Sequence, residues 1–351
     1  MAFHDKIGRF AGGFADYLMR DATDFDGLGR GDFKKAENID LLEREDIKEF
    51  IDMAVENSDL KRSEIINYLK DAESSKRAVQ ARSNQPEVKA TWDDYLSKRV
   101  TSRRIDNGVQ FLKEHIDIFE SAEKDYGVSK FYIASIIGME TNYGTYYGSY
   151  NPLDTIFTRA FDPSSNFWQK ELIQLFILSK RYNLNPKKIK SSWSGAIGLG
   201  QFIPSSYNAY GVDYDLNGFV DLLGSMEDGI ASVANYLKAN GWVSNKDAAI
   251  EIDFIGDFNN LDEDQINELS LPFKLNNFRT KINSDELKEA GFNFEGEYTS
   301  KISPILVRQK DSTKLYLGFD NFRVITKYNR SSKYALAVHQ LAIEISDKFY
   351  E

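Results

Sequence analysis

Hydrophobic residues recur three or four positions apart along most of the chain, with polar residues between them, which is the pattern of amphipathic helices. The first such stretch carries Phe3, Ile7, Phe10, Phe14 and Tyr17. It predicts a helix that packs on the domain or, alternatively, lies on a membrane surface. Two further apolar clusters between residues 36 and 85 predict a set of short helices.

The pattern changes twice farther along. A polar stretch at Ser83–Val88 predicts a linker, and helical spacing then resumes through Val109–Tyr126 before stopping at Gly127. Alternating residues at Ile250–Ile255 and Thr299–Val307 predict strands, with a helix between them at Ser284–Ala290. Helical spacing returns at Ser332–Phe349.

These patterns predict a mainly α fold of the α+β class in four parts. They are an N-terminal α-helical region (1–88), a core (89–245), a small β-rich subdomain (246–310) and a C-terminal segment with its helix (311–351). We find no internal repeat and no low-complexity tract.

Composition excludes several classes of protein. The formal net charge of −10 argues against a nucleic-acid binder. The absence of cysteine excludes disulfides and thiolate metal sites, and the three histidines show no ligand spacing. No stretch approaches the roughly 20 apolar residues that span a bilayer. The N-terminus does not read as a signal peptide, so either an export signal has been removed or another export route is used.

The first candidate for chemistry is Phe131–Gly144, an almost wholly apolar helix that ends at Glu140. A carboxyl group at the end of a buried helix loses hydration, which is expected to raise its pKa. A protonated carboxyl can donate a proton to a glycosidic oxygen. The alternative is a structural glutamate that bonds nearby backbone or an arginine.

The second candidate is Ser191–Tyr207, where Gly195, Gly198 and Gly200 allow another surface to approach the backbone closely. A phosphate-binding loop is excluded, because the glycines run G-x-x-G-x-G and no GK[ST] follows. Gln201 is the polar side chain presented after the turn. A tight structural turn remains the alternative.

Together, G-x-E-T-x-x-G and S-x-x-G-A-x-G-x-G-Q-F-x-P-S-S-Y resemble the lytic murein transglycosylase B family, whose core is similar to goose-type lysozyme. The likeness extends from about Lys48 to Ile343 and includes SVANYLKANGW and NFRVITKYNRSSKYALAVHQ. The resemblance implies a lysozyme-like catalytic core. It identifies Glu140 as the catalytic acid. The residues implied to hold the substrate are Ser192, Gln201, Tyr236, Tyr328, Asn329, Tyr95, Tyr143 and Phe167.

The chain departs from the family pattern in two places. Ser164 and Ser165 stand before Phe167 where the family usually presents adjacent arginines, so contacts there to a peptide stem or an acetamido group are not expected to match. Tyr143 stands where a tryptophan is common, which keeps an aromatic side chain at that position.

A third pattern spans residues 213–228. Asp213, Asp215, Asn217 and Gly218 fit positions one, three, five and six of a calcium loop, with the Phe219 carbonyl next. Gly224, at position twelve, cannot supply the usual carboxylate. The resemblance implies a longer loop closed by Asp228 that holds a structural calcium ion. The alternative is an Asx-rich turn without metal.

The resemblance implies a reaction with one carboxyl group. Glu140 protonates the bond between N-acetylmuramic acid and N-acetylglucosamine. It then takes the proton of the muramoyl C6 hydroxyl as that oxygen closes on C1, leaving a 1,6-anhydro end. No cofactor is required for this chemistry. Two alternatives stay open: a muramidase that adds water with a second carboxylate such as Asp154 or Asp162, and a non-catalytic peptidoglycan-binding protein.

The expected partners are therefore peptidoglycan glycan strands, with cell-wall or secretion-machinery proteins as further candidates. We expect a monomer that works in the periplasm.

Overall fold

The computed structural model describes residues 41–83, 91–254, 258 and 261–351. The helix predicted around Phe3–Tyr17 and most of the predicted linker lie outside these ranges. The chain forms two compact units, each made of two separate stretches of sequence. One unit combines Met1–Gln85 with Thr145–Ser232, and the other combines Pro86–Gly144 with Val233–Glu351. The predicted core (89–245) is thus divided between the two units.

The first unit is helical in its described part. Its elements are η1 (Leu41–Glu43), α3 (Glu45–Glu56), α4 (Arg62–Lys70), α5 (Lys76–Ser83), α10 (Pro152–Phe161), α11 (Asn166–Arg181), α12 (Pro204–Tyr210) and the start of α13 (Met226–Ala239). α11 packs against both α10 and α12. Asn151 and Ser165 cap α10 and α11 through their side chains, and prolines open α10 and α12, where a missing backbone N–H costs nothing.

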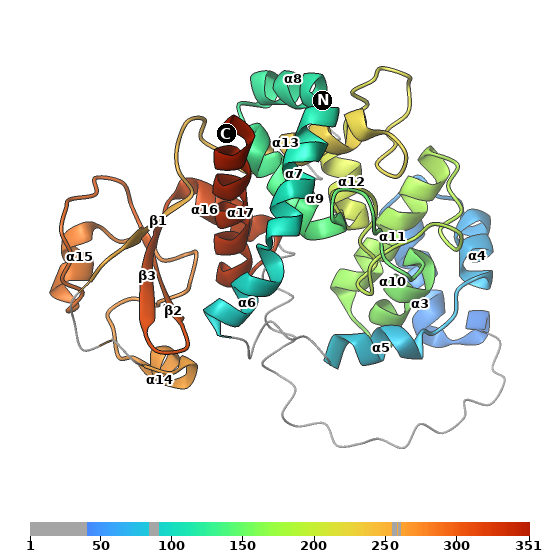
Figure 1. The fold of residues 1–351 in the computed structure, drawn as a ribbon. Coiled ribbons are helices and arrows are strands. Elements are labelled where there is room, and N and C mark those ends of the chain that lie inside the picture. Colours follow the sequence, from blue (N-terminus) through green and yellow to red (C-terminus); the bar gives the residue numbers. More distant parts are fainter. Residues whose placement is uncertain (1–40, 84–90, 255–257, 259–260) are drawn as a thin grey trace. The chain divides into compact units, whose positions relative to one another are not determined.

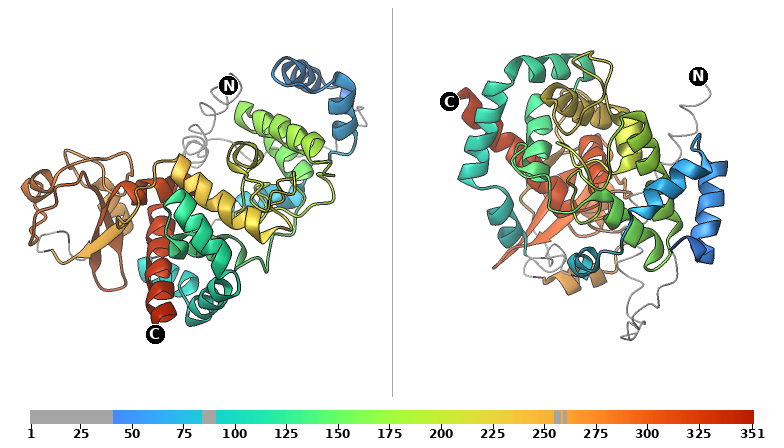
Figure 2. Two further views of the ribbon diagram at one scale, coloured as in Figure 1. Left: turned by 90° about the horizontal axis from the view of Figure 1, so that it is seen from above. Right: turned by 90° about the vertical axis from the view of Figure 1, so that its right-hand side faces the viewer.

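The second unit contains the remaining helices and a sheet. Its helices are α6 (Trp92–Arg99), α7 (Ser102–Glu114), α8 (Ile116–Tyr126), α9 (Lys130–Thr141), the end of α13, α14 (Glu263–Glu268), α15 (Ser284–Glu289), α16 (Asp320–Tyr328) and α17 (Ser332–Tyr350). α9 packs against α17, α7 and α8 (Figures 1 and 2). This surrounding explains why α9 is apolar on nearly every side.

Three antiparallel strands form the sheet of the second unit, in the order β1–β3–β2. They are β1 (Ala249–Ile252), β2 (Ser303–Arg308) and β3 (Thr313–Gly318). β2 and β3 are buried along almost their whole length, whereas β1 has one buried, one exposed and two partly exposed residues. The apolar cluster beside the sheet consists of Ile266, Ile282, Leu287, Phe292, Ile302, Leu306, Leu315 and Leu317.

The predicted fold class is confirmed: the described chain is mostly helical with one small sheet. The sheet reaches Gly318, beyond the predicted subdomain limit at 310. The helical pattern of Val109–Tyr126 divides at His115, because this residue leaves helical geometry and its carbonyl accepts the N–H groups of Ile118 and Phe119 in α8. None of the described helices is long and apolar enough to cross a membrane.

Candidate active site

Glu140 lies in the last turn of α9 and is partly exposed, whereas most of the helix before it is buried. α9 ends because Asn142 and Tyr143 both take the left-handed backbone conformation, with φ of 48° and 59°. Asn142 then donates its N–H to the Ile137 carbonyl, which closes the helix. The sequence therefore brings a carboxylate to the point where a buried helix reaches the surface of its unit.

A tyrosine from the C-terminal stretch of the same unit contacts this carboxylate. The Tyr334 hydroxyl donates to Glu140 Oε1 at 2.6 Å. Tyr334 is in the first turn of α17, where the Ser331 side chain accepts its N–H and begins the helix. Burial raises the pKa of Tyr334 well above 10, and the nearby charge of Glu140 adds to the effect. The phenol therefore stays protonated and remains a hydrogen-bond donor.

Two predicted tyrosines adjoin this pair. Burial and the charge of Glu140 also raise the pKa of Tyr328 well above 10. The rings of Tyr236 and Tyr328 meet edge to face, with centroids 4.7 Å apart. The Tyr236 hydroxyl donates to the Lys327 carbonyl at 2.7 Å, which holds its ring against α16. The structure thus places Glu140, Tyr236 and Tyr328 in one unit, and their common role with substrate stays a prediction.

Three other predicted residues are in the same unit but differ in exposure. Asn329 ends α16 and is partly exposed. Tyr95 is buried and contributes to the raised pKa of Tyr334, so it lies near that phenol. Tyr143 is only 7% exposed, and its hydroxyl donates to the Arg104 carbonyl at 2.9 Å. In this position Tyr143 packs between α9 and α7. Its contact with substrate stays a prediction.

Tyr334 itself was not among the sequence-derived candidates. It lies inside the stretch NFRVITKYNRSSKYALAVHQ that carries the resemblance, six positions after Tyr328. By periodicity Tyr334 is an ordinary core residue of α17, and the structure shows it buried, with 4% exposure. Its polar tip distinguishes it, because a buried tyrosine hydroxyl requires a partner.

Ser192 and Gln201 lie in the first unit, in the loop between α11 and α12. Ser192 Oγ accepts the N–H groups of Ser194 and Ala196 at 3.2 and 3.0 Å, and so shapes the turn. Gln201 has a φ of 51°, and its side-chain amide donates to the Gly198 carbonyl at 3.0 Å. Both side chains are partly exposed and thus available to a ligand.

Gly198 is required by close packing at this loop. Its φ is +80°, and a Cβ atom there would lie 2.5 Å from the Leu222 carbonyl oxygen. Leu199 donates its N–H to the same carbonyl at 2.8 Å. The loop that carries Gln201 is therefore held against the backbone at Leu222.

Glu171 is a buried carboxylate that the sequence did not single out. It lies within α11, is 3% exposed, and accepts the Ser205 N–H at 3.0 Å. Burial raises the pKa of Glu171 to about 7, although the bonds from Ser205 oppose the shift. Because Ser205 is in the first turn of α12, Glu171 fastens this helix to α11 directly after the Gln201 loop.

The remaining predicted residue of this unit, Phe167, is the second residue of α11. It is partly exposed and meets Trp168 edge to face, with centroids 5.1 Å apart.

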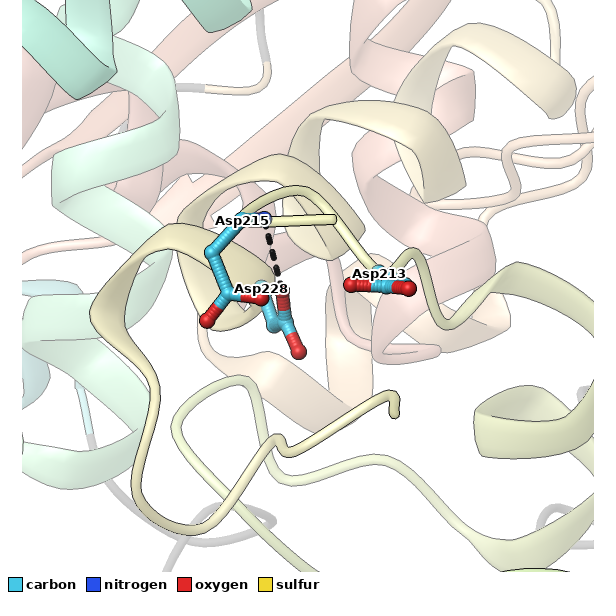
Figure 3. Close-up of side chains that lie close together, drawn as sticks. All are labelled: Asp213, Asp215 and Asp228. Atoms are coloured by element: carbon cyan, nitrogen blue, oxygen red, sulfur yellow. Dashed lines mark hydrogen bonds between the residues drawn. The ribbon is translucent and has the colours of Figure 1, made fainter. Parts of the chain in front are cut away.

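The loop from Asp213 to Asp228 brings three carboxylates together. One oxygen each of Asp213, Asp215 and Asp228 lie within 4.8 Å of one another. Figure 3 shows Asp228 beside Asp215, whose backbone N–H it accepts, and Asp213, at the start of the loop, to one side of them. Asp228 is fully buried, and burial raises its pKa although its carboxylate accepts N–H groups from Tyr214, Asp215 and Asp221.

The rest of the loop suits this arrangement. Gly218 has a φ of +89°, as the sixth position of a calcium loop requires, and Gly218 and Asn217 donate their N–H groups to Asp213. Three clustered negative charges repel one another unless a cation lies between them. Hard oxygen ligands of this kind fit a calcium ion.

Comparison with known proteins relates these features to a family. Residues 43–343 match the model of the transglycosylase SLT domain. The chain is 30% identical over 315 residues to membrane-bound lytic murein transglycosylase B of Escherichia coli strain K12, covering 86% of this chain and 83% of that protein.

Two solved structures share the fold. Soluble lytic transglycosylase SltB1 from Pseudomonas aeruginosa superposes with a TM-score of 0.75 at 30% identity, over 86% of this chain and 99% of that chain. The Escherichia coli lytic transglycosylase Slt35 in complex with calcium gives a TM-score of 0.76 at 29% identity, over 89% of this chain and 96% of that chain.

Proposed function

The chain belongs to the transglycosylase SLT domain family and is a peptidoglycan lytic transglycosylase, and we propose that Glu140 carries out both proton transfers of its reaction. The observation that carries this proposal is the placement of Glu140. It ends a buried helix, remains partly exposed, and accepts a hydrogen bond from a phenol that stays protonated.

In the proposed reaction Glu140 first acts as an acid. Its proton passes to the glycosidic oxygen between N-acetylmuramic acid and N-acetylglucosamine as the C1–O bond breaks. The resulting carboxylate then takes the proton of the muramoyl C6 hydroxyl while that oxygen bonds to C1. The product carries a 1,6-anhydro ring, and no water is consumed. One carboxyl group suffices, because the substrate supplies the nucleophile.

The Tyr334 hydroxyl supports the second half of this cycle. It donates to Glu140 Oε1, and a hydrogen bond from a phenol stabilises the carboxylate that forms when Glu140 has given up its proton. Tyr334 acts as a positioning residue for the acid.

We assign substrate binding to the other predicted residues. Ser192 and Gln201 are proposed to hold the acetamido group and the sugar, since both present polar side chains on a loop shaped by its backbone. Tyr236, Tyr328 and Asn329 are proposed to border the reacting sugar. Aromatic rings at Tyr95, Tyr143 and Phe167 complete the proposed set.

A muramidase that adds water would need a second carboxylate, and the contacts of the two candidates argue against that reaction. Asp154 Oδ1 accepts from Lys187 Nζ at 2.8 Å and from the Glu73 N–H at 2.9 Å, so Asp154 serves as a structural anchor. Asp162 is exposed at the end of α10. The joint presence of Glu140 and Tyr334 likewise argues against a protein that only binds glycan, because binding requires no acid.

We also propose a structural calcium ion at Asp213, Asp215 and Asp228, with Asn217 and the Phe219 carbonyl as further ligands. The three clustered carboxylates support this proposal, and a similar protein is described in complex with calcium. The ion would neutralise the cluster and fasten the loop to the start of α13. It takes no part in the proton transfers.

Peptidoglycan lies outside the cytoplasmic membrane, so we propose that the protein works in the periplasm as a monomer on glycan strands. Binding to cell-wall or secretion-machinery proteins remains a proposal that rests on the sequence resemblance.

The proposed role of Glu140 can be tested with Glu140→Gln. This variant keeps the shape of the side chain and an acceptor for Tyr334 but cannot supply a proton. We expect loss of turnover on purified sacculi with glycan binding retained. Glu114→Gln, at an exposed position of α7, is the matched control. Unchanged release of muropeptides by Glu140→Gln would refute the assignment.

A further inference from the structure

A groove in the first unit lies next to the Ser192 loop and carries positive charge. Its volume is about 540 Å³, and it is lined by residues 145–151 on one side and 187–190 on the other. The two sides are joined by an antiparallel bridge in which Tyr150 and Ser191 exchange backbone hydrogen bonds of 3.2 and 2.8 Å. The groove therefore has a defined shape.

Close backbone packing keeps the two sides together. Gly148 has a φ of +94°, and a Cβ atom there would lie 2.0 Å from the Ser191 carbonyl oxygen. Only glycine allows the two segments to approach this closely.

The charge of the groove comes from three lysines in four residues. Lys187 is neutralised locally, because its Nζ lies 2.8 Å from Asp154 Oδ1 and 3.5 Å from Glu73 Oε2. Lys188 and Lys190 are exposed and form no ion pair within the part of the chain that the structure describes. Two exposed cations beside one groove favour an anionic ligand there.

Tyrosine side chains also line the groove, and an arginine outside the lining contacts two of the lining residues. Tyr146 is 60% exposed at the groove. The Arg77 guanidinium lies 4.6 Å from the ring centroid of Tyr150 and donates to Ser149 Oγ at 2.9 Å. An exposed ring beside cations suits a ligand with both apolar and anionic groups.

The groove is also close in sequence to the loop that carries Ser192. Lys190 is two residues before Ser192, which we assign to the acetamido group. The groove and the Ser192 loop are therefore adjacent along the chain. The peptide stems of peptidoglycan are attached to the muramoyl residues and carry several carboxylates.

We propose that the groove lined by Lys188, Lys190 and Tyr146 binds the carboxylates of a peptidoglycan stem peptide. This proposal rests on the proposed function, since it requires a muramoyl residue at the Ser192 loop. The two lysines attract the carboxylates, and Tyr146 packs against the aliphatic parts of the stem. The chain thereby favours glycan that bears unamidated stems.

The test uses the Glu140→Gln chain, so that the ligand is not consumed. Calorimetry compares a disaccharide carrying a tetrapeptide stem with the same molecule whose peptide carboxylates are amidated. We expect about tenfold tighter binding of the carboxylate form, as two exposed ion pairs allow. The preference should shrink as salt is added.

A variant that also carries Lys188→Gln and Lys190→Gln should bind both ligands equally well. Its affinity for the amidated ligand should be unchanged. The matched control is Lys70→Gln with Lys274→Gln, two exposed lysines outside the groove, which removes the same charge and should keep the preference. The proposal is overturned if the groove variant retains the preference, if the control loses it equally, or if the parent shows none.

Digestion of sacculi by the unmodified chain separates this outcome from failure of the proposed function. If anhydro products form while the groove variant still prefers the carboxylate ligand, the groove proposal is wrong and the function stands. If no anhydro products form, the function fails as well.

Discussion

The Tyr334 hydroxyl donates to Glu140 Oε1 at 2.6 Å, joining the first turn of α17 to the last turn of α9. The two residues are 194 positions apart in the sequence. The bond gives one oxygen of the carboxylate a donor that stays protonated. The proposed chemistry thus depends on how two helices of one unit pack.

Tyr334→Phe removes this donor and little else. We expect kcat to fall by about ten- to a hundredfold, because hydrogen bonds to charged groups contribute roughly 1.5–3 kcal/mol, with KM little changed. The matched control is Tyr316→Phe, which removes a similar bond, from Tyr316 to Glu251 Oε2 at 2.7 Å, in the sheet. Equal kinetic losses in the two variants would mean that the Glu140 contact has no special role.

The raised pKa of Glu171 implies that the free energy of unfolding depends on pH. Burial raises its pKa from 4.5 to about 7 in the folded protein. As pH rises from 4.5 to 7 the unfolded chain releases this proton while the folded chain keeps it, so stability falls across that window and levels off above it. The shift corresponds to about 3 kcal/mol.

Urea unfolding of Glu171→Gln at pH 5 and pH 8 measures this contribution. The variant should lose less stability than the unmodified chain between the two values, because glutamine does not titrate. Glu114→Gln, at an exposed site, should behave like the unmodified chain. Parallel pH profiles for the Glu171 variant and the unmodified chain would exclude a raised pKa at Glu171.

The carboxylate cluster predicts stabilisation by calcium. At a calcium concentration about a hundred times Kd the free energy of unfolding should rise by roughly 3 kcal/mol, with a higher Tm in scanning calorimetry. Asp215→Asn, at an exposed position of the cluster, should weaken the effect, and Asp253→Asn, outside it, should not. A Tm that does not respond to calcium or to a chelator would contradict the proposed site.

Gly198→Ala tests how the Gln201 loop is held. A methyl group there would lie 2.5 Å from the Leu222 carbonyl oxygen, so the loop must move. We expect a destabilisation of about 1–3 kcal/mol and a raised KM. Gly241→Ala provides the control, since Gly241 also has a positive φ, of +100°, but no atom lies within 4 Å of its added Cβ. Equal effects would mean that backbone strain alone accounts for both.

Much of this site could be predicted from the sequence, for local reasons. The apolar run before Glu140 and the following Asn142 determine a buried helix and its end, and both are close in sequence to the acid. The spacing of Asp213, Asp215 and Gly218 likewise lies within one loop. The resemblance to a family then supplied residues that are distant in sequence, such as Tyr236 and Tyr328.

What could not be predicted depends on packing between distant segments. The Tyr334 contact requires α17 to lie against α9, and no periodicity specifies which residue then meets Glu140. The burial of Tyr143 follows from the left-handed turn after α9, which directs its ring back toward Arg104. The division of the predicted core between two units follows from contacts between separate stretches of chain, which a scan along the sequence cannot detect.

The central claim is that Glu140 transfers the proton while the muramoyl C6 hydroxyl attacks C1 of the same sugar. The most direct measurement is digestion of sacculi in water enriched in a heavy oxygen isotope, followed by mass spectrometry of the products. We predict 1,6-anhydro ends, each one water lighter than a hydrolysed end and free of the isotope, and no products from Glu140→Gln. Isotope-labelled reducing ends, or products from the variant, would contradict the account.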